Sequence, residues 1–193
     1  MIIHFYGNRG SGKTLSSVIL CDLLNKFYNS KNKRCIIFSD VEMQLREYDI
    51  IEYFNKEFQN TKQPKIFLFD EVDKFVDSRS SMTLTNKYIS YSIGLSRKTD
   101  TDYIFTTQIY NSLDVRLRRF TDLIISPTYN KKTYKLKWDI QNLNLDISKT
   151  LNVNLDIKKY YKKYDTNYLT LDLIDNYMLK FQNLTKNFKG NKK

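Results

Sequence analysis

The residues best suited to chemistry lie near the N-terminus. Gly7–Thr14 reads Gly-Asn-Arg-Gly-Ser-Gly-Lys-Thr and fits G-x-x-x-x-G-K-[ST], the phosphate-binding P-loop, or Walker A motif. Its glycines let successive backbone N–H groups point at one anion, Lys13 adds a positive charge for the β- and γ-phosphates, and the Thr14 hydroxyl suits Mg²⁺. We therefore expect ATP and Mg²⁺ as cofactors. The expected nucleotide-binding residues are Gly7, Asn8, Arg9, Gly10, Ser11, Gly12, Lys13 and Thr14.

Two carboxylates follow an apolar run and fit the acidic partner of a P-loop. Asp70 comes directly after Lys65–Phe69, as a Walker B motif requires. Its carboxylate would hold Mg²⁺ through water, opposite Thr14, so Thr14 and Asp70 are the expected metal residues. The neighbouring Glu71 would accept a proton from the water that attacks the γ-phosphate, or orient that water. The alternative is an acidic helix N-cap after a strand, and the upstream P-loop argues against it.

A further polar side chain, Gln108, follows the apolar run Tyr103–Thr107. Its amide could sense the γ-phosphate or position water, although a plain loop residue would look the same. Glu71 beside Asp70, with a polar residue after the following strand, points to the P-loop class whose catalytic glutamate is built in. In that class the Gln108 strand lies between the P-loop strand and the Asp70 strand, whereas the kinases and GTPases of the other class place those two strands side by side.

The apolar pattern predicts the elements that must position these motifs. Short strands alternate with helices, which is typical of an α/β fold with a mostly parallel sheet. The expected strands are residues 2–6, 35–38, 65–69, 103–107 and 123–125. An apolar stripe at every fourth position, made of Leu15, Ile19, Leu23 and Phe27, predicts a helix over about residues 13–27. Other helices are expected near residues 50–58, 83–96 and 112–119. Ligands bind such sheets at the carboxyl ends of the strands, so the motifs should converge there.

After residue 127 the pattern becomes that of an antiparallel hairpin. Residues 134–140 alternate apolar with charged side chains, and a second strand is expected near residues 151–155. A basic, tyrosine-containing patch and an amphipathic helix follow at residues 158–163 and 171–181. We expect a three-layer P-loop NTPase fold, RecA/ASCE-like, whose mostly parallel central sheet is extended by C-terminal antiparallel strands. The expected parts are an ATPase core (1–127), a C-terminal extension packed on it (128–185) and a flexible basic tail (186–193).

The charge balance suits a polyanionic partner. Lys and Arg number 32 against 21 Asp and Glu, which gives the 193-residue chain a net charge of +11. Nucleic acid is the first partner for such an excess and an anionic membrane surface the second, although lysines also serve solubility alone. No apolar run approaches the roughly 20 residues of a membrane span, and no signal peptide is visible, so an intracellular location is expected. His4 is the single histidine, which argues against a histidine-based metal or triad site and favours a core position.

Several stretches together resemble the FtsK–HerA superfamily of ATPases. They are Gly7–Thr14, Phe69-Asp70-Glu71, Ser96–Gln108 and Asp114–Arg118. The sequence looks most like the compact genome-packaging ATPases of archaeal and other double-stranded DNA viruses, and the Zot-like proteins of filamentous phages are related. Tyr164–Asn167 resembles a C-terminal element of these viral proteins. The resemblance covers residues 1–128 well and the rest weakly, and the Ser-Arg-Lys…Thr-Thr-Gln stretch is more discriminating than the P-loop.

The resemblance implies a homo-oligomeric ring, a pentamer or hexamer, around double-stranded DNA, with ATP sites between neighbouring subunits. It implies a virus-encoded protein of the host cytoplasm that works with a capsid or portal component. It also implies an arginine finger donated in trans. Arg97 is the first candidate, because the family carries a basic residue before the glutamine strand. Second choices, which could equally be solvated or DNA-facing charges, are Arg116, Arg118 and Arg119. Contacts to DNA phosphates are expected from Lys131, Lys132, Lys135, Lys137 and residues 158–163.

The predicted function is an ATP-hydrolysing DNA translocase that packages double-stranded viral DNA into a capsid. Its expected catalytic residues are Glu71, Lys13, Gln108 and Arg97. One alternative is a Zot-like phage assembly or extrusion ATPase, which would need a membrane segment, and none is present in the sequence. A second is a small nucleoside or nucleotide kinase with a lid rich in arginines. A third is a nucleotide-gated binding protein without turnover, against which Asp70-Glu71 argues.

Overall fold

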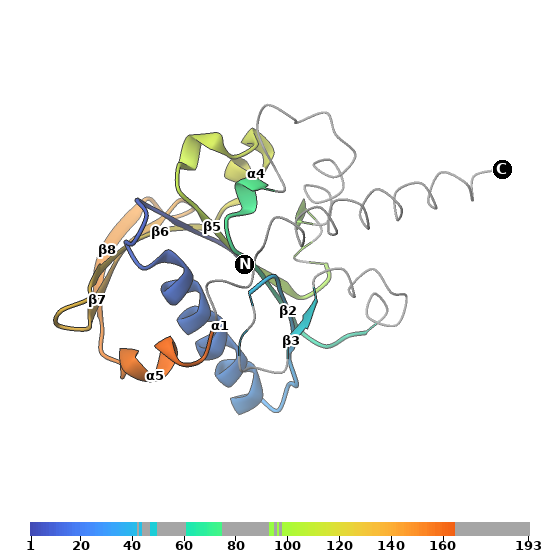
Figure 1. Cartoon of the computed structure of the whole chain (residues 1–193). Coiled ribbons are helices and arrows are strands. Elements are labelled where there is room, and N and C mark those ends of the chain that lie inside the picture. Colours follow the sequence, from blue (N-terminus) through green and yellow to red (C-terminus); the bar gives the residue numbers. More distant parts are fainter. Residues whose placement is uncertain are drawn as a thin grey trace.

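One eight-stranded sheet organises the part of the chain that the computed structural model describes, which is residues 1–41, 43, 47–49, 61–74, 93–94, 96 and 98–164. The strands are β1 (Ile2–Tyr6), β2 (Ile36–Ser39), β3 (Glu47–Asp49), β4 (Lys65–Phe69), β5 (Thr101–Thr107), β6 (Leu123–Asn130), β7 (Lys135–Asn142) and β8 (Ile147–Val153). Their order is β3-β2-β4-β5-β1-β6-β7-β8 (Figure 1). Pairs from β3 to β6 are parallel, and β7 and β8 are added antiparallel. The predicted mostly parallel sheet with C-terminal antiparallel strands is therefore confirmed.

Helices cover both faces of this sheet and complete three layers. α1 (Lys13–Ser30) lies with α5 (Ile157–Tyr161) on one face, and α4 (Val115–Phe120) lies on the other (Figure 1). Short 3₁₀ turns, η2 (Val72–Lys74) and η4 (Tyr110–Ser112), follow β4 and β5. Each face has its own apolar cluster, because alternate strand residues point in opposite directions. The α1 side buries Phe5 and Ile19, and the α4 side buries Phe105 and Leu117.

The strand order places the motifs as the sequence predicted. β5 lies between β1 and β4, so the Gln108 strand separates the P-loop strand from the Asp70 strand. The P-loop follows β1, Asp70 follows β4 and Gln108 follows β5. Because neighbouring parallel strands end at the same edge, all of these residues meet there.

Aromatic side chains stack across the central strands on the α4 side. Register brings Phe38 of β2 opposite Phe67 of β4, and Phe67 opposite Tyr103 of β5. Ring centroids are 4.8 Å apart for Phe38–Phe67 and 5.1 Å apart for Phe67–Tyr103. Such pairs add about 0.5–1.5 kcal/mol each beyond the area they bury. This row of rings holds β2, β4 and β5 in the register that the site requires.

The first helix differs from its predicted apolar stripe. Leu15 and Ile19 are buried, but Leu23 is 37% and Phe27 53% exposed. A spacing of four residues advances about 40° per step around a helix of 3.6 residues per turn, so the stripe rotates off the core face. Val18 and Cys21 are fully buried instead. The helix also runs to Ser30, beyond the predicted end.

The C-terminal hairpin and α5 are fastened to α1. Trp138 of β7 donates its indole N–H to Ser16 Oγ at 2.9 Å, and its ring packs edge-on against Phe5 at 5.8 Å. The Tyr160 hydroxyl of α5 donates to Asp22 Oδ2 at 2.6 Å. The predicted hairpin is confirmed, although its second strand is Ile147–Val153 rather than residues 151–155. β6 runs through residue 127, where the core was expected to end, and β8 forms one edge of the sheet.

Other predictions concern segments that the structure describes only in part. The helix expected near residues 50–58, the helix expected at 171–181 and the tail at 186–193 lie outside the described residues, as does most of the helix expected near 83–96. The short strand β3 was not predicted. Residues 112–119 were predicted as one helix, but the chain instead forms η4 and then α4, which begins at Val115 after the N-cap Asp114. Within the described ranges, no helix combines the length and hydropathy that a membrane crossing requires.

His4 occupies the predicted core position and is fully buried in β1. Its Nε2 lies 2.8 Å from Thr107 Oγ1, and its ring stacks on Tyr110 at 5.1 Å. Burial lowers the pKa of His4 from 6.5 to about 3, because the imidazolium would lose its hydration. The imidazole is therefore neutral in the folded protein at physiological pH.

This burial predicts a pH-dependent stability. An unfolded chain protonates His4 near pH 6.5 and the folded chain only near pH 3, so the unfolded state binds more protons between these values. The free energy of unfolding should thus decrease as pH falls below about 6.5, by up to about 1.4 kcal/mol per pH unit. Urea denaturation of wild type and His4→Gln between about pH 7 and 5, where most carboxylates stay ionised, measures this slope. Equal slopes in the two proteins would contradict the assignment.

Candidate nucleotide-binding site

The loop between β1 and α1 has the backbone that a phosphate cradle requires. Gly7, Gly10 and Gly12 have φ angles of 146°, 81° and 94°, a region that residues with a Cβ rarely adopt. A Cβ added at Gly12 would lie only 2.8 Å from the Tyr129 Cβ. Gly12 is also the N-cap of α1, and no side chain caps that end. The first N–H groups of the 18-residue helix α1 are therefore available to an anion.

Lys13 lies folded into this loop. Its Nζ donates to the carbonyl oxygens of Gly7 at 3.0 Å and Asn8 at 3.1 Å, and the residue is 8% exposed. Burial lowers the pKa of Lys13, while attraction from nearby carboxylates opposes this shift; they are Asp70, Glu71 and Asp73. The Lys13 ammonium therefore lies between two loop carbonyls and close to three carboxylates. When a triphosphate binds, phosphate oxygens can replace the two carbonyl contacts.

The two expected metal residues are in direct contact. Thr14 Oγ1 donates to both Asp70 oxygens, at 3.0 Å to Oδ1 and 3.1 Å to Oδ2. A hydroxyl and a carboxylate are oxygen donors, which Mg²⁺ prefers, and Mg²⁺ in such sites takes its other ligands from water and phosphate. Thr14 and Asp70 therefore fit Mg²⁺ binding, and the ion would supply charge neutralisation between the β- and γ-phosphates.

Two positioning residues were missed by sequence reasoning. Thr106 of β5 donates its hydroxyl to Asp70 Oδ1 at 2.6 Å and accepts the Glu71 N–H at 2.8 Å. Asp40, directly after β2, accepts the Asp70 N–H at 2.8 Å through its Oδ1. Both residues are fully buried. The only signal in the sequence was a polar residue at the carboxyl end of an apolar strand in each case.

The expected general base and the expected sensor lie side by side. Gln108 Nε2 is 3.4 Å from Glu71 Oε1 and donates to it. Glu71 has a φ of 52°, an uncommon backbone conformation for a residue with a side chain, which costs roughly 1–2 kcal/mol. The Thr106 hydroxyl, which accepts the Glu71 N–H, stabilises this conformation. The arrangement thus presents one carboxylate and one amide together beside the P-loop.

A cavity of about 490 Å³ joins these groups. Its lining includes the P-loop and the two carboxylates, and then Gln108, Arg9, Lys131, Tyr129, Tyr161 and Tyr164. Lys131, which was predicted as a DNA contact, also lines this cavity. The three tyrosines were not predicted as site residues, although the patch at residues 158–163 was noted as basic and tyrosine-containing.

The arginine-finger candidates differ in the contacts that the structure gives them. Arg97 lies outside the described residues. Arg116 forms two hydrogen bonds with the Asp114 carboxylate, at 2.9 Å from Nε and 2.7 Å from Nη2. Arg118 lies over the Tyr110 ring at 6.0 Å, and Arg119 is exposed. In the described part of the chain none of these three lines the P-loop cavity.

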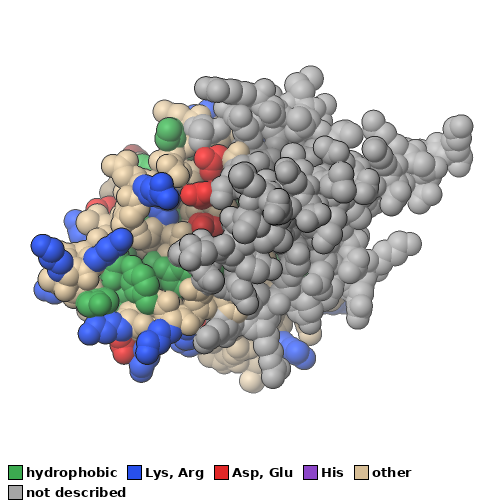
Figure 2. Space-filling model, viewed as in Figure 1, with side chains coloured by type: hydrophobic (Ala, Val, Ile, Leu, Met, Phe, Trp, Pro, Cys, Tyr) green, Lys and Arg blue, Asp and Glu red, His purple; other side chains and the backbone are tan. Residues whose placement is uncertain are grey.

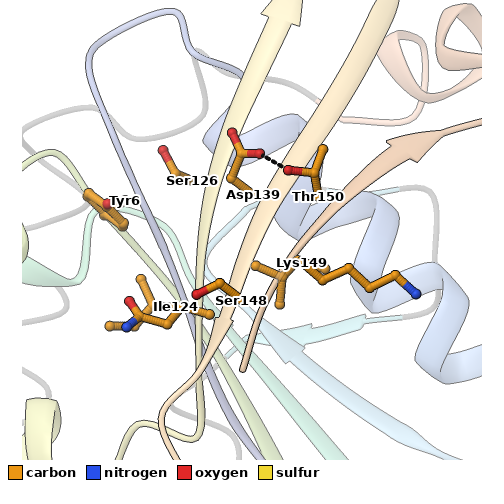
Figure 3. A pocket seen from close by; sticks show the side chains of 9 residues that line it. Tyr6, Ile124, Ser126, Asp139, Ser148, Lys149 and Thr150 are labelled. Carbon is orange, nitrogen blue, oxygen red and sulfur yellow. Dashed lines mark hydrogen bonds between the residues drawn. The ribbon is translucent and has the colours of Figure 1, made fainter. Parts of the chain in front are cut away.

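A second cavity, of about 300 Å³, lies on the opposite face of the sheet (Figure 3). Tyr6, Ile124 and Asp139 are among the residues that line it. Asp139 accepts the Thr150 hydroxyl at 2.6 Å and pairs with Lys137 at 3.2 Å. Its lining includes neither glycine loop nor acidic pair, so the chemistry that the sequence predicted belongs to the P-loop cavity.

The contacts of Thr106 yield a prediction about catalysis. Thr106→Val keeps the shape of the side chain but leaves Asp70 and the Glu71 N–H without this hydroxyl. Loss of a buried partner costs about 1–3 kcal/mol, so we expect kcat for ATP hydrolysis to fall about tenfold or more with little change in KM. Thr107→Val, one residue along β5 and facing His4, is the matched control. A kcat unchanged in Thr106→Val would contradict the positioning role.

Comparison with solved structures gives the same fold. The N-terminal domain of zonular occludens toxin from Neisseria meningitidis is 18% identical with a TM-score of 0.61, and the match covers 85% of this chain and 98% of that one. The genome packaging NTPase B204 from Sulfolobus turreted icosahedral virus 2, in complex with ATP-gammaS, is 16% identical with a TM-score of 0.56, over 80% and 98%. At these identities the likeness concerns the fold alone. A search of curated protein sequences gave no match.

A comparison with protein families is more specific. Residues 3–128 match the AAA family, the ATPase family associated with various cellular activities. The matched range includes the P-loop, the acidic pair and Gln108, whose side chains meet at one cavity. The finer FtsK–HerA assignment stays a prediction. The match spans well over half of the chain, and the protein therefore belongs to the AAA family of P-loop ATPases.

Proposed function

We propose that this ATPase is a DNA translocase that packages double-stranded viral DNA into a capsid. The observation that carries the proposal is the pairing of Glu71 with Gln108 beside the Thr14–Asp70 contact. A carboxylate base built into the same subunit as the P-loop serves continuous turnover, as a motor requires. Similarity to a viral genome packaging NTPase supports the choice of substrate.

We propose a role in hydrolysis for each group of the site. Lys13 would leave its loop carbonyls for the β- and γ-phosphates, and Thr14 and Asp70 would hold Mg²⁺ there. Glu71 would accept a proton from the attacking water, and Gln108, hydrogen-bonded to Glu71, would couple the state of the γ-phosphate to motion of the strand ends. Arg97 of a neighbouring subunit remains our first candidate for the finger that stabilises transition-state charge. Arg116 is less suited, because Asp114 already binds its guanidinium.

The DNA surface is proposed at the β7–α5 end of the molecule. Figure 2 shows Lys and Arg side chains around a hydrophobic patch on the side that carries β7 and α5. Lys158 lies over the Tyr134 ring at 4.7 Å, so the basic patch of α5 adjoins the turn between β6 and β7. Lys132 lies on that turn. Lys135 and Lys137 lie on β7 and project from the face away from α5, because they alternate with the buried Leu136 and Trp138, so the proposed surface extends around the end of the sheet. Contacts from these lysines to phosphates would bind DNA without regard to sequence, as a translocase requires.

The assembly belongs to the same proposal. A ring of five or six identical subunits would place the finger of one subunit at the nucleotide of the next. A capsid or portal component would hold the ring, and packaging would take place in the host cytoplasm.

The second candidate is a Zot-like phage assembly or extrusion ATPase. The observation in its favour is the similarity to the N-terminal domain of zonular occludens toxin over 85% of this chain. The kinase alternative loses support from the strand order, because β5 separates the P-loop strand from the Asp70 strand. Stimulation by duplex DNA separates packaging from the Zot-like candidate.

The role of Glu71 predicts a selective loss of hydrolysis. Glu71→Gln should still bind ATP and should hydrolyse it at least about 10²-fold more slowly, since the amide cannot accept the proton. Asp146→Asn is a matched control, because Asp146 lies exposed in the β7–β8 turn with a φ of 51° that asparagine tolerates. Nucleotide binding by calorimetry and phosphate release by a coupled assay measure the two effects. Normal turnover in Glu71→Gln would remove Glu71 from its role.

The proposed substrate predicts stimulation by DNA. Double-stranded DNA should raise the ATPase rate severalfold, and the stimulation should weaken as salt rises because phosphate contacts release counterions. Lys135→Ala with Lys137→Ala should reduce the stimulation while the basal rate stays the same. Lys33→Ala, in the loop that follows α1, is the control and removes an exposed charge away from the proposed surface. A basal rate that no concentration of duplex DNA changes would count against packaging and favour the Zot-like alternative.

A further inference from the structure

Part of the lining of the P-loop cavity has no role in the proposed hydrolysis, and this part is aromatic. Tyr129 of β6, Tyr161 of α5 and Tyr164 after α5 all line the cavity. The Tyr161 ring contacts both of the others in a tilted arrangement, with centroids 5.7 Å apart for Tyr129–Tyr161 and 6.3 Å apart for Tyr161–Tyr164. Tyr161 is 41% exposed, so part of its ring is accessible. The described parts of the catalytic machinery make no use of these rings.

The tyrosines are held in place by backbone and packing contacts. The Tyr129 Cβ lies against the Cα of Gly12, and a Cβ at that glycine would approach it to 2.8 Å. α5, which carries Tyr161, is fixed to α1 through the Tyr160–Asp22 hydrogen bond. Tyr164 forms an antiparallel β-bridge with Met43, on the segment after β2. Each of the three tyrosines is therefore held beside the phosphate loop by a contact to a different part of the fold.

The lining of the cavity carries two kinds of group. Lys13, the open N-terminus of α1 and the Thr14–Asp70 pair favour a polyphosphate and its cation. Three tyrosines on the same lining offer phenol rings, and burial, with the Tyr161 hydroxyl nearby, raises the pKa of Tyr129 to about 12. The Tyr129 phenol is therefore neutral at physiological pH and presents its π-face and edge. A ligand that joins a polyphosphate to a flat heteroaromatic ring matches this combination.

We propose that Tyr129, Tyr161 and Tyr164 form the nucleobase subsite of the P-loop cavity, so that the C-terminal segment around α5 completes the ATP site. The inference rests on the nucleotide binding that the proposed function requires. It adds that recognition of the base comes from residues far from the P-loop in sequence. Stacking uses the π-face that every base has, so the subsite distinguishes bases by ring area more than by hydrogen-bond pattern. Purine triphosphates should bind better than pyrimidine triphosphates.

The decisive measurement compares a ligand with a base and a ligand without one. Wild type and variants are titrated with AMP-PCP and with inorganic tripolyphosphate, both with Mg²⁺, by isothermal calorimetry. Loss of one stacked ring weakens base binding roughly 5- to 150-fold. Tyr161→Leu should therefore lose AMP-PCP affinity by a factor in this range and keep its tripolyphosphate affinity. Tyr161→Phe keeps the ring and should bind AMP-PCP as wild type does.

Two further variants serve as a control and as an independent test. Phe27→Leu removes an exposed aromatic ring from α1 outside the cavity and should leave both affinities unchanged. Tyr129→Leu should resemble Tyr161→Leu, provided that its thermal unfolding matches wild type, because Tyr129 also packs on Gly12.

The outcomes separate this inference from the proposed function. Tripolyphosphate bound normally, together with an unchanged AMP-PCP affinity in Tyr161→Leu, would overturn the base subsite and leave the P-loop assignment standing. Equal losses for both ligands in Tyr161→Leu would also overturn it, because the ring would then be shaping the phosphate loop. Failure of wild type to bind either ligand would overturn the nucleotide site itself, and the subsite with it.

Discussion

The Asp70 carboxylate makes the contacts on which the geometry of the site depends. It accepts hydrogen bonds from Thr14 at the start of α1 and from Thr106 on β5, while its backbone N–H donates to Asp40 after β2. One residue thus ties the phosphate loop to the ends of three strands. Charge-assisted hydrogen bonds of this kind are stronger than neutral ones, and their loss leaves buried groups unpaired. Because the same carboxylate is the expected Mg²⁺ residue, the metal would bind where the scaffold is most firmly defined.

The sequence predicted the parts of the site whose signal is local. The P-loop spacing, the acidic pair after an apolar run and Gln108 after the next one are each contained in a few residues, and the parallel-sheet rule brings them together. Thr106 and Asp40 could not be assigned, because their roles depend on strand register: Phe105 pairs with Phe69, which sets the next residues, Thr106 and Asp70, beside each other. The α1 stripe failed for a different reason, because residues four apart advance about 40° per step around the helix and Leu23 and Phe27 therefore lie off the buried face.

The three tyrosines of the P-loop cavity could not be predicted from the sequence, because they lie far from the P-loop along the chain. Tyr129 and Tyr161 are separated from Gly12 by more than a hundred residues, and only the folding of the hairpin and α5 over α1 brings them back. Trp138 and Tyr160 make this return possible through Ser16 and Asp22, two polar groups on a helix face that hydropathy alone would assign to solvent. The extension is therefore continuous with the core through β6 and also bound to its first helix. Any rearrangement of α1 around a nucleotide would be transmitted directly to the extension.

β8 is the outermost strand on one side of the sheet, and some of its apolar side chains are exposed to water. Ile147 is 56% and Leu151 41% exposed, and Lys149 lies between them. Outer strands of this composition are templates for unwanted strand addition, and a lysine in the middle discourages it by charge repulsion. The charge of Lys149 on this outer strand would oppose the addition of a strand from another molecule. A neutral residue there would be expected to lower the solubility of the protein without touching its chemistry.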